Sequence, residues 1–432
     1  MNVEDNDLLC RVEASAPMGQ LMRRHWLPAC MSEEVAARDG APLRTRLLGE
    51  DLVVFRDTNG RVGVLGEHCL HRRASLFFAR NEACGLRCLY HGWKFDVDGN
   101  VLEMASEPDG DRLRQGLKHK AYPAREVGGF VWVYMGPQDD DMIELEPPSW
   151  APSPRTKISI VKIRINCNWA QVLEGAIDSA HSSTLHSTNM PSAQVDRAKA
   201  TQTSWPRPST DKAPRLQHQL TSYGFRYAAI RKPILNPDTH DYVRITVFIA
   251  PFTVLIPPND QYNLAQMLVP IDDENTMFYW VAWHETKGIE QEAWREFCAA
   301  QVGIDLDANY RPIRTLANNF LQDRDLMKTG DFTGIKGIPA QDMAMWVSMG
   351  PITDRSSEYL GSSDGAVFQF RKQMLAAVKG FQAGEPALGT TRPHVPHAKI
   401  ASFEGMVAKT TNWRTLAVSA EELSSMSAAA PA

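Results

Sequence analysis

The stretch Cys69-Leu-His71, followed by Cys88-Leu-Tyr-His91, decides the fold of this chain. Two cysteines and two histidines lie in two short clusters, and each cluster joins one thiol to one imidazole. Sixteen residues separate His71 from Cys88. Mixed pairs of this kind suit a centre in which two thiolates hold one iron and two imidazoles hold another.

Such a centre is a Rieske [2Fe–2S] cluster, and its neutral imidazole ligands raise the reduction potential. The alternative is a Cys2His2 zinc site, which uses similar spacings. Zinc sites usually group like ligands, whereas each cluster of this chain joins a cysteine to a histidine. The residues that follow the two histidines, 72–74 and 92–93, also favour an iron–sulfur site over a zinc site. Cys84 has no matching histidine, and we interpret it as a loop or core thiol. We therefore predict a domain that transfers single electrons.

Length and composition narrow the class of protein. The chain has 432 residues, which suits two or three domains, and it is 43% hydrophobic and 22% charged. A net charge of −5 gives no support for nucleic-acid binding. The seven cysteines are dispersed and the first residues are acidic, so we expect a reducing, cytoplasmic location without signal peptide or membrane anchor.

The predicted fold class is α+β with two domains. Residues 1–150 are expected to hold an N-terminal helix and an all-β Rieske domain, in which Asn59-Gly60 between two apolar runs predicts a hairpin. A proline-rich linker over residues 144–154 leads to a second domain, expected over residues 151–420. Residues 421–432 are predicted to be a disordered tail.

Periodicity within residues 151–420 predicts strands and helices. Strands are expected at residues 158–165 and 242–249, and helices at residues 169–181, 289–300 and 365–383. These elements predict a sheet with helices packed on it.

A second constellation lies in the predicted helix 169–181. Glu174, Asp178 and His181 are spaced i, i+4, i+7 and are expected to share one helical face. His186 lies five residues beyond His181, so the helix must end or bend near residues 182–183 if both rings are to meet one ion. Two histidines held in this way fill two positions of a 2-His-1-carboxylate iron site, which leaves positions open for dioxygen. The alternative is that they are helix caps or core residues.

Together these segments resemble the oxygenase component of Rieske non-haem iron oxygenases, most closely the phthalate dioxygenase group. The resemblance extends from about residue 15 to about residue 380. One departure is Leu70, where many relatives have proline. The matching segments are Cys69–Phe78, Cys88–Asp96, Asn168–Gln171, Glu174–His186, Gln341-Asp342, Ser348–Pro351, Asp354-Arg355 and Leu360–Asp364.

The resemblance implies roles that spacing leaves open. It implies an antiparallel helix-grip catalytic domain in which His181 and His186 are iron ligands. Several acids could be the third ligand, among them Asp323, Asp325, Asp331 and Asp342. The family pattern selects Asp342, although a helix cap is the alternative for that residue. Asp178 is expected to link the iron site to the cluster of a neighbouring subunit, in a homotrimer or stacked trimers.

The resemblance also implies an aromatic carboxylate substrate. Arginine offers a two-pronged partner for a buried carboxylate. Arg244 is on an aromatic-bearing face of the predicted strand 242–249, and Arg207 is in a proline-flanked loop. Both match positions where the phthalate group is expected to hold substrate carboxylates, whereas composition alone would make them surface residues.

The expected activity is cis-dihydroxylation of a phthalate isomer or a (chloro)benzoate with O2. No G-x-G-x-x-G fingerprint is visible, so electrons from NAD(P)H would come from a separate reductase with flavin and a ferredoxin-type iron–sulfur centre. O-demethylation of methoxybenzoates is the nearest alternative. Alternatives of a different class are an electron carrier or redox sensor without oxygenase activity, and a zinc-stabilised interaction module.

Overall fold

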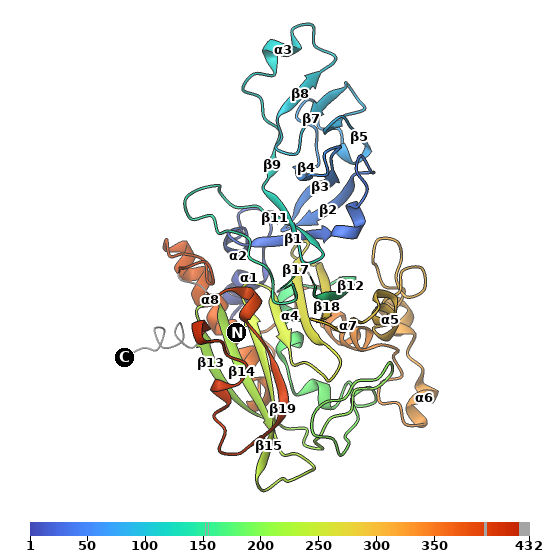
Figure 1. The fold of residues 1–432 in the computed structure, drawn as a ribbon, viewed down its shortest axis with the longest axis vertical. Coiled ribbons are helices and arrows are strands. Elements are labelled where there is room, and N and C mark those ends of the chain that lie inside the picture. Colours follow the sequence, from blue (N-terminus) through green and yellow to red (C-terminus); the bar gives the residue numbers. More distant parts are fainter. Residues whose placement is uncertain (152, 154, 393–394, 423–432) are drawn as a thin grey trace. The chain divides into compact units, whose positions relative to one another are not determined.

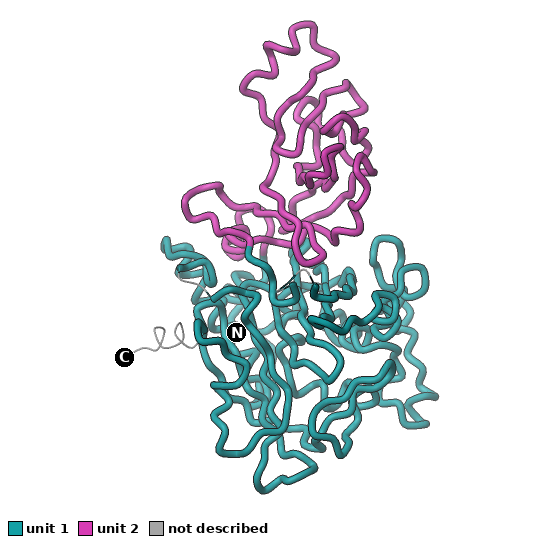
Figure 2. The backbone as a smooth tube through the Cα atoms, viewed as in Figure 1, with its two compact units in different colours: residues 1–11, 146–432 teal, residues 12–145 magenta. Residues whose placement is uncertain are grey.

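The computed structural model describes residues 1–151, 153, 155–392 and 395–422. The chain divides into two compact units, which are coloured separately in Figure 2. Unit 2 contains residues 12–145, and unit 1 contains residues 1–11 together with residues 146–432. The first helix is thus grouped with unit 1, whereas the sequence-based division at residue 150 assigned it to the cluster domain. Most of the predicted tail, residues 423–432, lies outside the described residues.

Unit 2 is built from three small antiparallel sheets, ordered β1-β11-β10, β2-β3-β4-β9 and β5-β6-β7-β8. Its strands are β1 (Trp26–Met31), β2 (Leu43–Leu47), β3 (Glu50–Arg56), β4 (Val62–Gly66), β5 (Arg80–Glu82), β6 (Gly85–Arg87), β7 (Trp93–Phe95), β8 (Val101–Met104), β9 (Ala121–Tyr122), β10 (Ala124–Val127) and β11 (Phe130–Tyr134). Two short helices accompany them, α2 (Pro17–Met22) and α3 (Gly110–Leu113).

The hairpin predicted at Asn59-Gly60 is confirmed. Strands β3 and β4 pair antiparallel with Arg56 opposite Val62, and Gly60 adopts a left-handed φ of 84° in the turn. Glycine occupies this conformation without the steric cost that a Cβ atom would bring. The hairpin contributes Phe55 and Leu65 to a buried core that also contains Cys69 and Cys88.

Unit 1 is organised around one eight-stranded antiparallel sheet (Figure 1). The strand order is β12-β18-β17-β16-β15-β14-β13, and β19 also pairs with β15. The strands are β12 (Lys157–Ile165), β13 (Arg215–Thr221), β14 (Gly224–Arg231), β15 (His240–Ile249), β16 (Thr253–Ile256), β17 (Asn263–Pro270), β18 (Thr276–His284) and β19 (Phe403–Ala408). The predicted strands at 158–165 and 242–249 correspond to β12 and β15 and are confirmed.

Helices of unit 1 complete the fold. They are α1 (Val3–Cys10), α4 (Trp169–Ile177), α5 (Gln291–Phe297), α6 (Arg324–Lys328), α7 (Ile338–Ser348) and α8 (Gly365–Gln382). The helices predicted at 289–300 and 365–383 are confirmed as α5 and α8. No helix in the described part of the chain is long and apolar enough to cross a membrane.

The helix predicted over residues 169–181 is shorter than expected, which corrects one inference. Helix α4 ends at Ile177, and a separate short 3-10 helix follows at His181–Ser183. Asp178 ends α4 because its Oδ1 atom accepts hydrogen bonds from the backbone N–H groups of Ala180 and His181, at 2.7 and 3.4 Å. A side chain that satisfies the backbone locally competes with helix continuation. Glu174, Asp178 and His181 therefore do not share one helical face.

Candidate active site

The two cluster segments of unit 2 are a matched pair of turns. The N–H of Arg73 donates to the carbonyl of Cys69 at 3.0 Å, and the N–H of Gly92 donates to the carbonyl of Cys88 at 2.9 Å. Each turn ends on a left-handed residue, with φ of 63° at Arg73 and 73° at Gly92. At Gly92 a Cβ atom would also come within 2.8 Å of the Ala105 Cβ atom. Each turn thus presents one cysteine and one histidine from a tight loop.

The four side chains at these turns fit a Rieske cluster. Cys69 and Cys88 are almost fully buried, and the rings of His71 and His91 lie 4.4 Å apart between centroids. His71 also stacks on Trp93, with 4.7 Å between ring centroids. The Nδ1 atom of His71 is buried and has no hydrogen-bond partner among the described residues. A buried ring nitrogen is normally satisfied, so this atom fits a metal ligand.

Protonation equilibria in this pocket agree with that fit. Burial, together with the neighbouring Cys88, raises the pKa of the Cys69 thiol to about 11. Partial desolvation and the adjacent His71 lower the pKa of His91. The raised pKa keeps the Cys69 thiol protonated in the absence of a cation. A bound metal deprotonates its thiol ligands and requires neutral imidazoles. The site therefore has the donor chemistry that iron demands.

In unit 1 the structure brings His181, His186 and Asp342 together. The Nε2 atoms of the two histidines lie 3.2 Å apart. The Oδ1 atom of Asp342 lies 3.0 Å from the Nε2 atom of His186 and 3.5 Å from the Nε2 atom of His181. Metal bonds of about 2.1 Å at right angles would separate neighbouring ligand atoms by about 3.0 Å. One face of an octahedron therefore fits these three donor atoms, and no further histidine, cysteine or acid joins them in the candidate metal group among the described residues.

The other acids considered as a third ligand have local structural roles. Asp323 caps α6 through hydrogen bonds from the N–H groups of Asp325 and Leu326, Asp325 pairs with Lys328, and Asp331 accepts from the loop 333–334. Asp342 is not a helix cap, because it lies inside α7, five residues after the cap residue Gly337. Among the described residues, this aspartate is the one that joins the two histidines in a candidate metal group.

Close packing of α4 on α7 places the histidine-bearing segment beside Asp342. A Cβ atom on Gly175 would come within 2.1 Å of the Trp346 Nε1 atom. Gln171 adds two hydrogen bonds from its Nε2 atom to the carbonyls of Trp346 and Gly350, at 3.2 and 3.0 Å. The absence of a side chain at Gly175 therefore sets the separation of the two elements.

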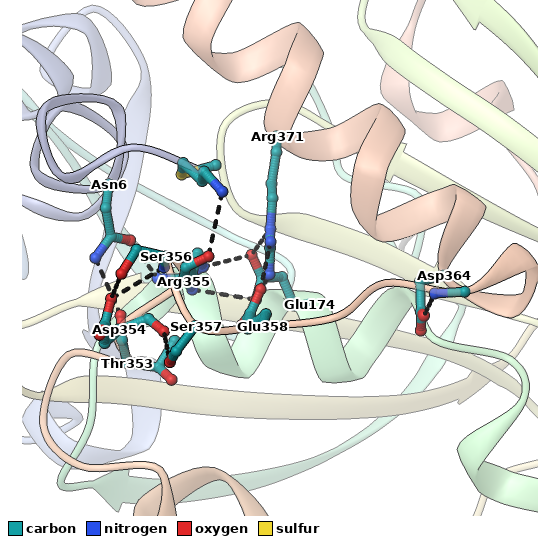
Figure 3. A network of polar contacts seen from close by, with 12 residues as sticks. Asn6, Glu174, Thr353, Asp354, Arg355, Ser356, Ser357, Glu358, Asp364 and Arg371 are labelled. Carbon is teal, nitrogen blue, oxygen red and sulfur yellow. Dashed lines mark hydrogen bonds and ion pairs between the residues drawn. The ribbon is translucent and has the colours of Figure 1, made fainter.

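Glu174 holds α4 in place through the network of ion pairs in Figure 3. Its carboxylate takes paired hydrogen bonds from Arg355 at 3.0 and 3.1 Å, and from Arg371 at 2.7 and 3.0 Å. Arg371 also pairs with Glu358 at 2.6 Å. Burial alone would raise the pKa of Glu174, but the two guanidinium groups outweigh it and hold that pKa below its usual value. Glu174 is thus part of a structural ion-pair network.

Asp178 contacts the histidine side of the metal site. Its Oδ2 atom lies 3.4 Å from the Nδ1 atom of His181, and its side chain keeps 24% of its surface exposed. Burial opposes ionisation, but the hydrogen bond and the charge of His181 lower the pKa of Asp178 overall. An ionised carboxylate therefore touches a candidate ligand and remains accessible to a further partner.

Arg207 and Arg244 line the same cavity as His181, His186 and Asp342. Arg207 is 5% exposed and donates from Nη1 to the Ser182 hydroxyl at 2.8 Å. Its Nε and Nη2 atoms have no hydrogen-bond partner among the described residues. Burial and the neighbouring Arg244 lower the pKa of Arg207 to about 9. The positive charge of the Arg207 guanidinium is therefore not balanced by a carboxylate partner among the described residues.

Arg244 differs because it has an acidic partner. Its Nε atom lies 3.4 Å from the Oε1 atom of Glu404, which faces it across the β15–β19 pair. The hydroxyl of Tyr242 donates to the same carboxylate. Burial lowers the pKa of Arg244, but attraction to Glu404 outweighs this and raises it overall. Both arginines, predicted from sequence as substrate contacts, thus reach the cavity, although one is already paired.

Sequence reasoning missed two residues at the site. Gln341, next to Asp342, accepts a hydrogen bond from the Nδ1 atom of His186 at 2.7 Å. Arg231 is buried beside the same loop and donates to the carbonyl of Ser179 at 2.7 Å. The Gln-Asp step was visible in the sequence, but nothing local indicated that the glutamine side chain would point at a histidine. Arg231 gave no signal because it ends an ordinary strand.

An all-β domain with paired Cys-His turns, joined to an α+β domain with two histidines and an aspartate at one point, defines a Rieske non-haem iron oxygenase. Residues 25–116 match the Rieske [2Fe-2S] domain family, and residues 133–431 match the family described as LigXa C-terminal domain like. The chain belongs to the Rieske oxygenases and is the oxygenase component of such an enzyme. Its Rieske domain holds a [2Fe–2S] cluster, and its catalytic domain carries a mononuclear iron.

Individual relatives agree with this assignment. The chain is 61% identical to the phthalate 4,5-dioxygenase oxygenase subunit of Pseudomonas putida, over 95% of this chain and 93% of the relative. It is 36% identical to the 3-chlorobenzoate-3,4-dioxygenase oxygenase subunit of Comamonas testosteroni, over 91% of this chain and 92% of the relative. The terminal oxygenase of carbazole 1,9a-dioxygenase from Novosphingobium sp. KA1 shares the fold, with a TM-score of 0.56 at 19% identity, over 87% of this chain and 96% of that one.

Proposed function

We propose that this oxygenase cis-dihydroxylates the ring of an aromatic carboxylate, either a phthalate isomer or a (chloro)benzoate. The observation that carries the proposal is Arg207, a buried guanidinium with two unpartnered nitrogen atoms in the same cavity as the metal-binding triad. A substrate carboxylate would satisfy those atoms and offset the cost of burying the charge. The names of the relatives at 61% and 36% identity point to the same substrate class.

In this proposal each metal has defined protein ligands. Cys69 and Cys88 hold one iron of the cluster, and His71 and His91 hold the other. His181, His186 and Asp342 hold the mononuclear iron. When bound, that iron supplies open coordination positions at which O2 is activated.

The protein's own side chains position the substrate. Arg207 and Arg244 bind carboxylate oxygens and fix the orientation of the ring relative to the triad. Trp205, Trp280 and Trp346 line the cavity with apolar surface, which excludes water from the reaction. Gln341 keeps the Nδ1 atom of His186 protonated, so the Nε2 lone pair of His186 is free to bind metal.

Electrons are proposed to reach the triad from the cluster of a neighbouring subunit through Asp178. This route is supported by the contact of Asp178 with His181 and by the part of the Asp178 side chain that stays exposed and accessible to a neighbouring subunit. This route requires a homotrimer or stacked trimers. A separate reductase, with flavin and a ferredoxin-type iron–sulfur centre, would supply the electrons from NAD(P)H. The seven cysteines form no disulfide among the described residues, which supports a reducing cytoplasmic location.

The test is product analysis with isotopically labelled O2. The purified protein and a compatible reductase are supplied with phthalate isomers, benzoates, chlorobenzoates and methoxybenzoates, and coupled O2 uptake is recorded. Two labelled oxygens on adjacent ring carbons of one of these acids are the expected result. Formaldehyde release from a methoxybenzoate, without ring diols from any acid, would instead establish O-demethylation. Electron uptake with no organic product would contradict an oxygenase activity toward these acids.

A further inference from the structure

A second cavity in unit 1 lies next to the cavity that contains the triad. It is lined by Arg207, Arg231, Lys212, Ser187, Ser209 and Tyr242, among others. It contains none of the three candidate iron ligands, so its chemistry is independent of the metal. Arg207 and Met190 line both cavities, which makes the two spaces neighbours across Arg207.

Positive charge exceeds negative charge in this second cavity. Arg231 is 3% exposed and Arg207 is 5% exposed, whereas Lys212 is exposed. The one carboxylate in the lining, Asp211, accepts backbone N–H groups at both oxygens, from Ala213 at 2.9 Å and from Lys232 at 3.2 Å. Three cationic side chains therefore line this cavity with one carboxylate, Asp211, whose two oxygens already accept backbone hydrogen bonds. An anion is the ligand that this imbalance favours.

Unpartnered buried nitrogens support the same ligand class. Arg231 uses Nη1 and Nη2 on the Ser179 and Ser183 oxygens, but its Nε atom has no hydrogen-bond partner among the described residues. The Nε and Nη2 atoms of Arg207 also have no hydrogen-bond partner among the described residues. Burial and the charge of Arg244 lower the pKa of Arg231. A bound carboxylate would supply hydrogen-bond acceptors and negative charge together.

We infer that this cavity is an outer carboxylate site, through which an anionic aromatic substrate enters the iron cavity past Arg207. Lys212 attracts the anion at the exposed end, and Arg231 receives it in the buried part. Arg207 then passes it to the inner site, because this side chain lines both spaces. The inference rests on the proposed substrate class, and it assigns binding roles to Lys212 and Arg231, which contact neither the triad nor Asp178 in the described structure.

The test measures how fast the ligand binds. Phthalate is mixed with the oxidised, iron-loaded holoenzyme without reductase, and tryptophan fluorescence is followed by stopped flow, because three tryptophans line the inner cavity. The variants are Lys212→Met, Arg231→Met and Arg231→Lys. Lys372→Met is the matched control, since Lys372 is an exposed lysine on α8 that lines neither cavity. Iron content and the cluster absorption spectrum are recorded for each protein.

We expect the association rate constant to fall about tenfold in Arg231→Met and about threefold in Lys212→Met. Lys372→Met should keep the wild-type rate, and Arg231→Lys should recover part of the loss because it restores the charge. The dependence of the rate on ionic strength should weaken in Lys212→Met. Wild-type association in both Lys212→Met and Arg231→Met would overturn the inference.

Iron content and a second anion distinguish an outer anion site from a purely structural role of Arg231. If Arg231→Met loses iron, its main role is to hold the loop 179–183, and Lys212→Met then decides the inference alone. If the wild-type protein binds neither phthalate nor 3-chlorobenzoate, the proposed substrate class fails, and inorganic phosphate replaces phthalate as the probe. Phosphate binding that is weakened in Lys212→Met but not in Lys372→Met would support an anion site, whereas equal binding in the two variants would refute it.

Discussion

The Nδ1 atom of His186 lies 2.7 Å from the Oε1 atom of Gln341, and this contact sets which nitrogen of the histidine faces Asp342. The amide of Gln341 is oriented by its own donations to Asn189 at 3.1 Å and to the Ile335 carbonyl at 3.0 Å. The glutamine oxygen must therefore accept, and the Nδ1 atom of His186 must donate. The Nε2 atom is left as an acceptor, 3.0 Å from Asp342.

Replacing Gln341 should weaken the mononuclear iron site. In Gln341→Leu the ring of His186 loses its orienting acceptor, and we expect iron affinity to fall about 10- to 100-fold. Gln341→Glu is the matched variant, because a carboxylate still accepts from Nδ1 and should keep more of the iron. Iron is measured after dialysis against a chelator, with cluster absorption as the internal standard. Equal iron retention in all three proteins would contradict this role.

Removing one member of the triad should empty the mononuclear site alone. We expect His181→Ala to lose the iron beyond that of the cluster, since two donors bind far more weakly than three, while cluster absorption is unchanged. Metal analysis with visible spectroscopy checks this. His240→Ala, at the start of β15 and outside the candidate site, should keep wild-type iron. A His181→Ala protein with wild-type iron would make the triad structural.

Asp178→Asn should separate electron transfer from metal binding. The amide keeps the size of the side chain but removes the charge beside His181, so we expect both metal sites to stay occupied. Oxidation of the reduced cluster, in the presence of substrate and O2, should slow by about 10- to 100-fold. Stopped-flow absorption of the cluster measures the rate. Unchanged oxidation and turnover would refute the bridging role.

Loss of Arg207 should affect substrate binding more than metal binding. In Arg207→Met a carboxylate loses a buried charged partner, which costs about 2 kcal/mol or more, or roughly 30-fold in Kd. Arg244→Ala should also weaken binding while both metal sites remain occupied, but it leaves Glu404 without its guanidinium partner. Calorimetric titration with phthalate, alongside iron analysis, distinguishes these effects. Wild-type affinity in Arg207→Met would remove the main support for the proposed substrate class.

The Glu174 network predicts a pH-dependent stability. Its folded-state pKa is lowered, so this carboxylate stabilises the fold above its unfolded pKa of about 4.3, and the contribution is lost as the pH falls through the folded value. At neutral pH, Glu174→Gln should lower the free energy of unfolding by about 3 kcal/mol, because two buried guanidinium groups lose their carboxylate.

Urea titrations at several pH values from neutrality to well below pH 4, where this contribution is lost, check this prediction. The loss of stability toward low pH should be smaller in Glu174→Gln than in wild type. Glu421→Gln is the control. Like Glu174, Glu421 takes part in an ion pair, in this case with Lys399, but the Glu421 side chain is 51% exposed. An exposed pair contributes little. Parallel stability curves for Glu174→Gln and wild type would show that Glu174 does not supply this pH dependence.

Local patterns in the sequence predicted the Rieske domain, the hairpin at Asn59-Gly60, and strands β12 and β15. These features depend on residues close together in the chain, where spacing and alternation report geometry directly. The end of α4 was placed wrongly, because the hydrogen bonds that Asp178 makes to the backbone outcompeted the helical pattern. The selection of Asp342 required the family resemblance, since nothing in its own segment distinguished it from Asp323 or Asp331.

By itself, the sequence predicted the two candidate metal-binding segments, because the candidate ligands within each segment are close together in the chain and their spacing is visible without the fold. Only the tertiary structure shows how distant side chains reach the candidate site and which of them have partners there. Gly175 allows α4 to pack on α7, which brings Asp342 and Gln341 to His186, and the β15–β19 pairing gives Arg244 its partner Glu404. Among the described residues Arg207 has no such acidic partner, and this difference between the two arginines depends on packing that local sequence patterns do not report.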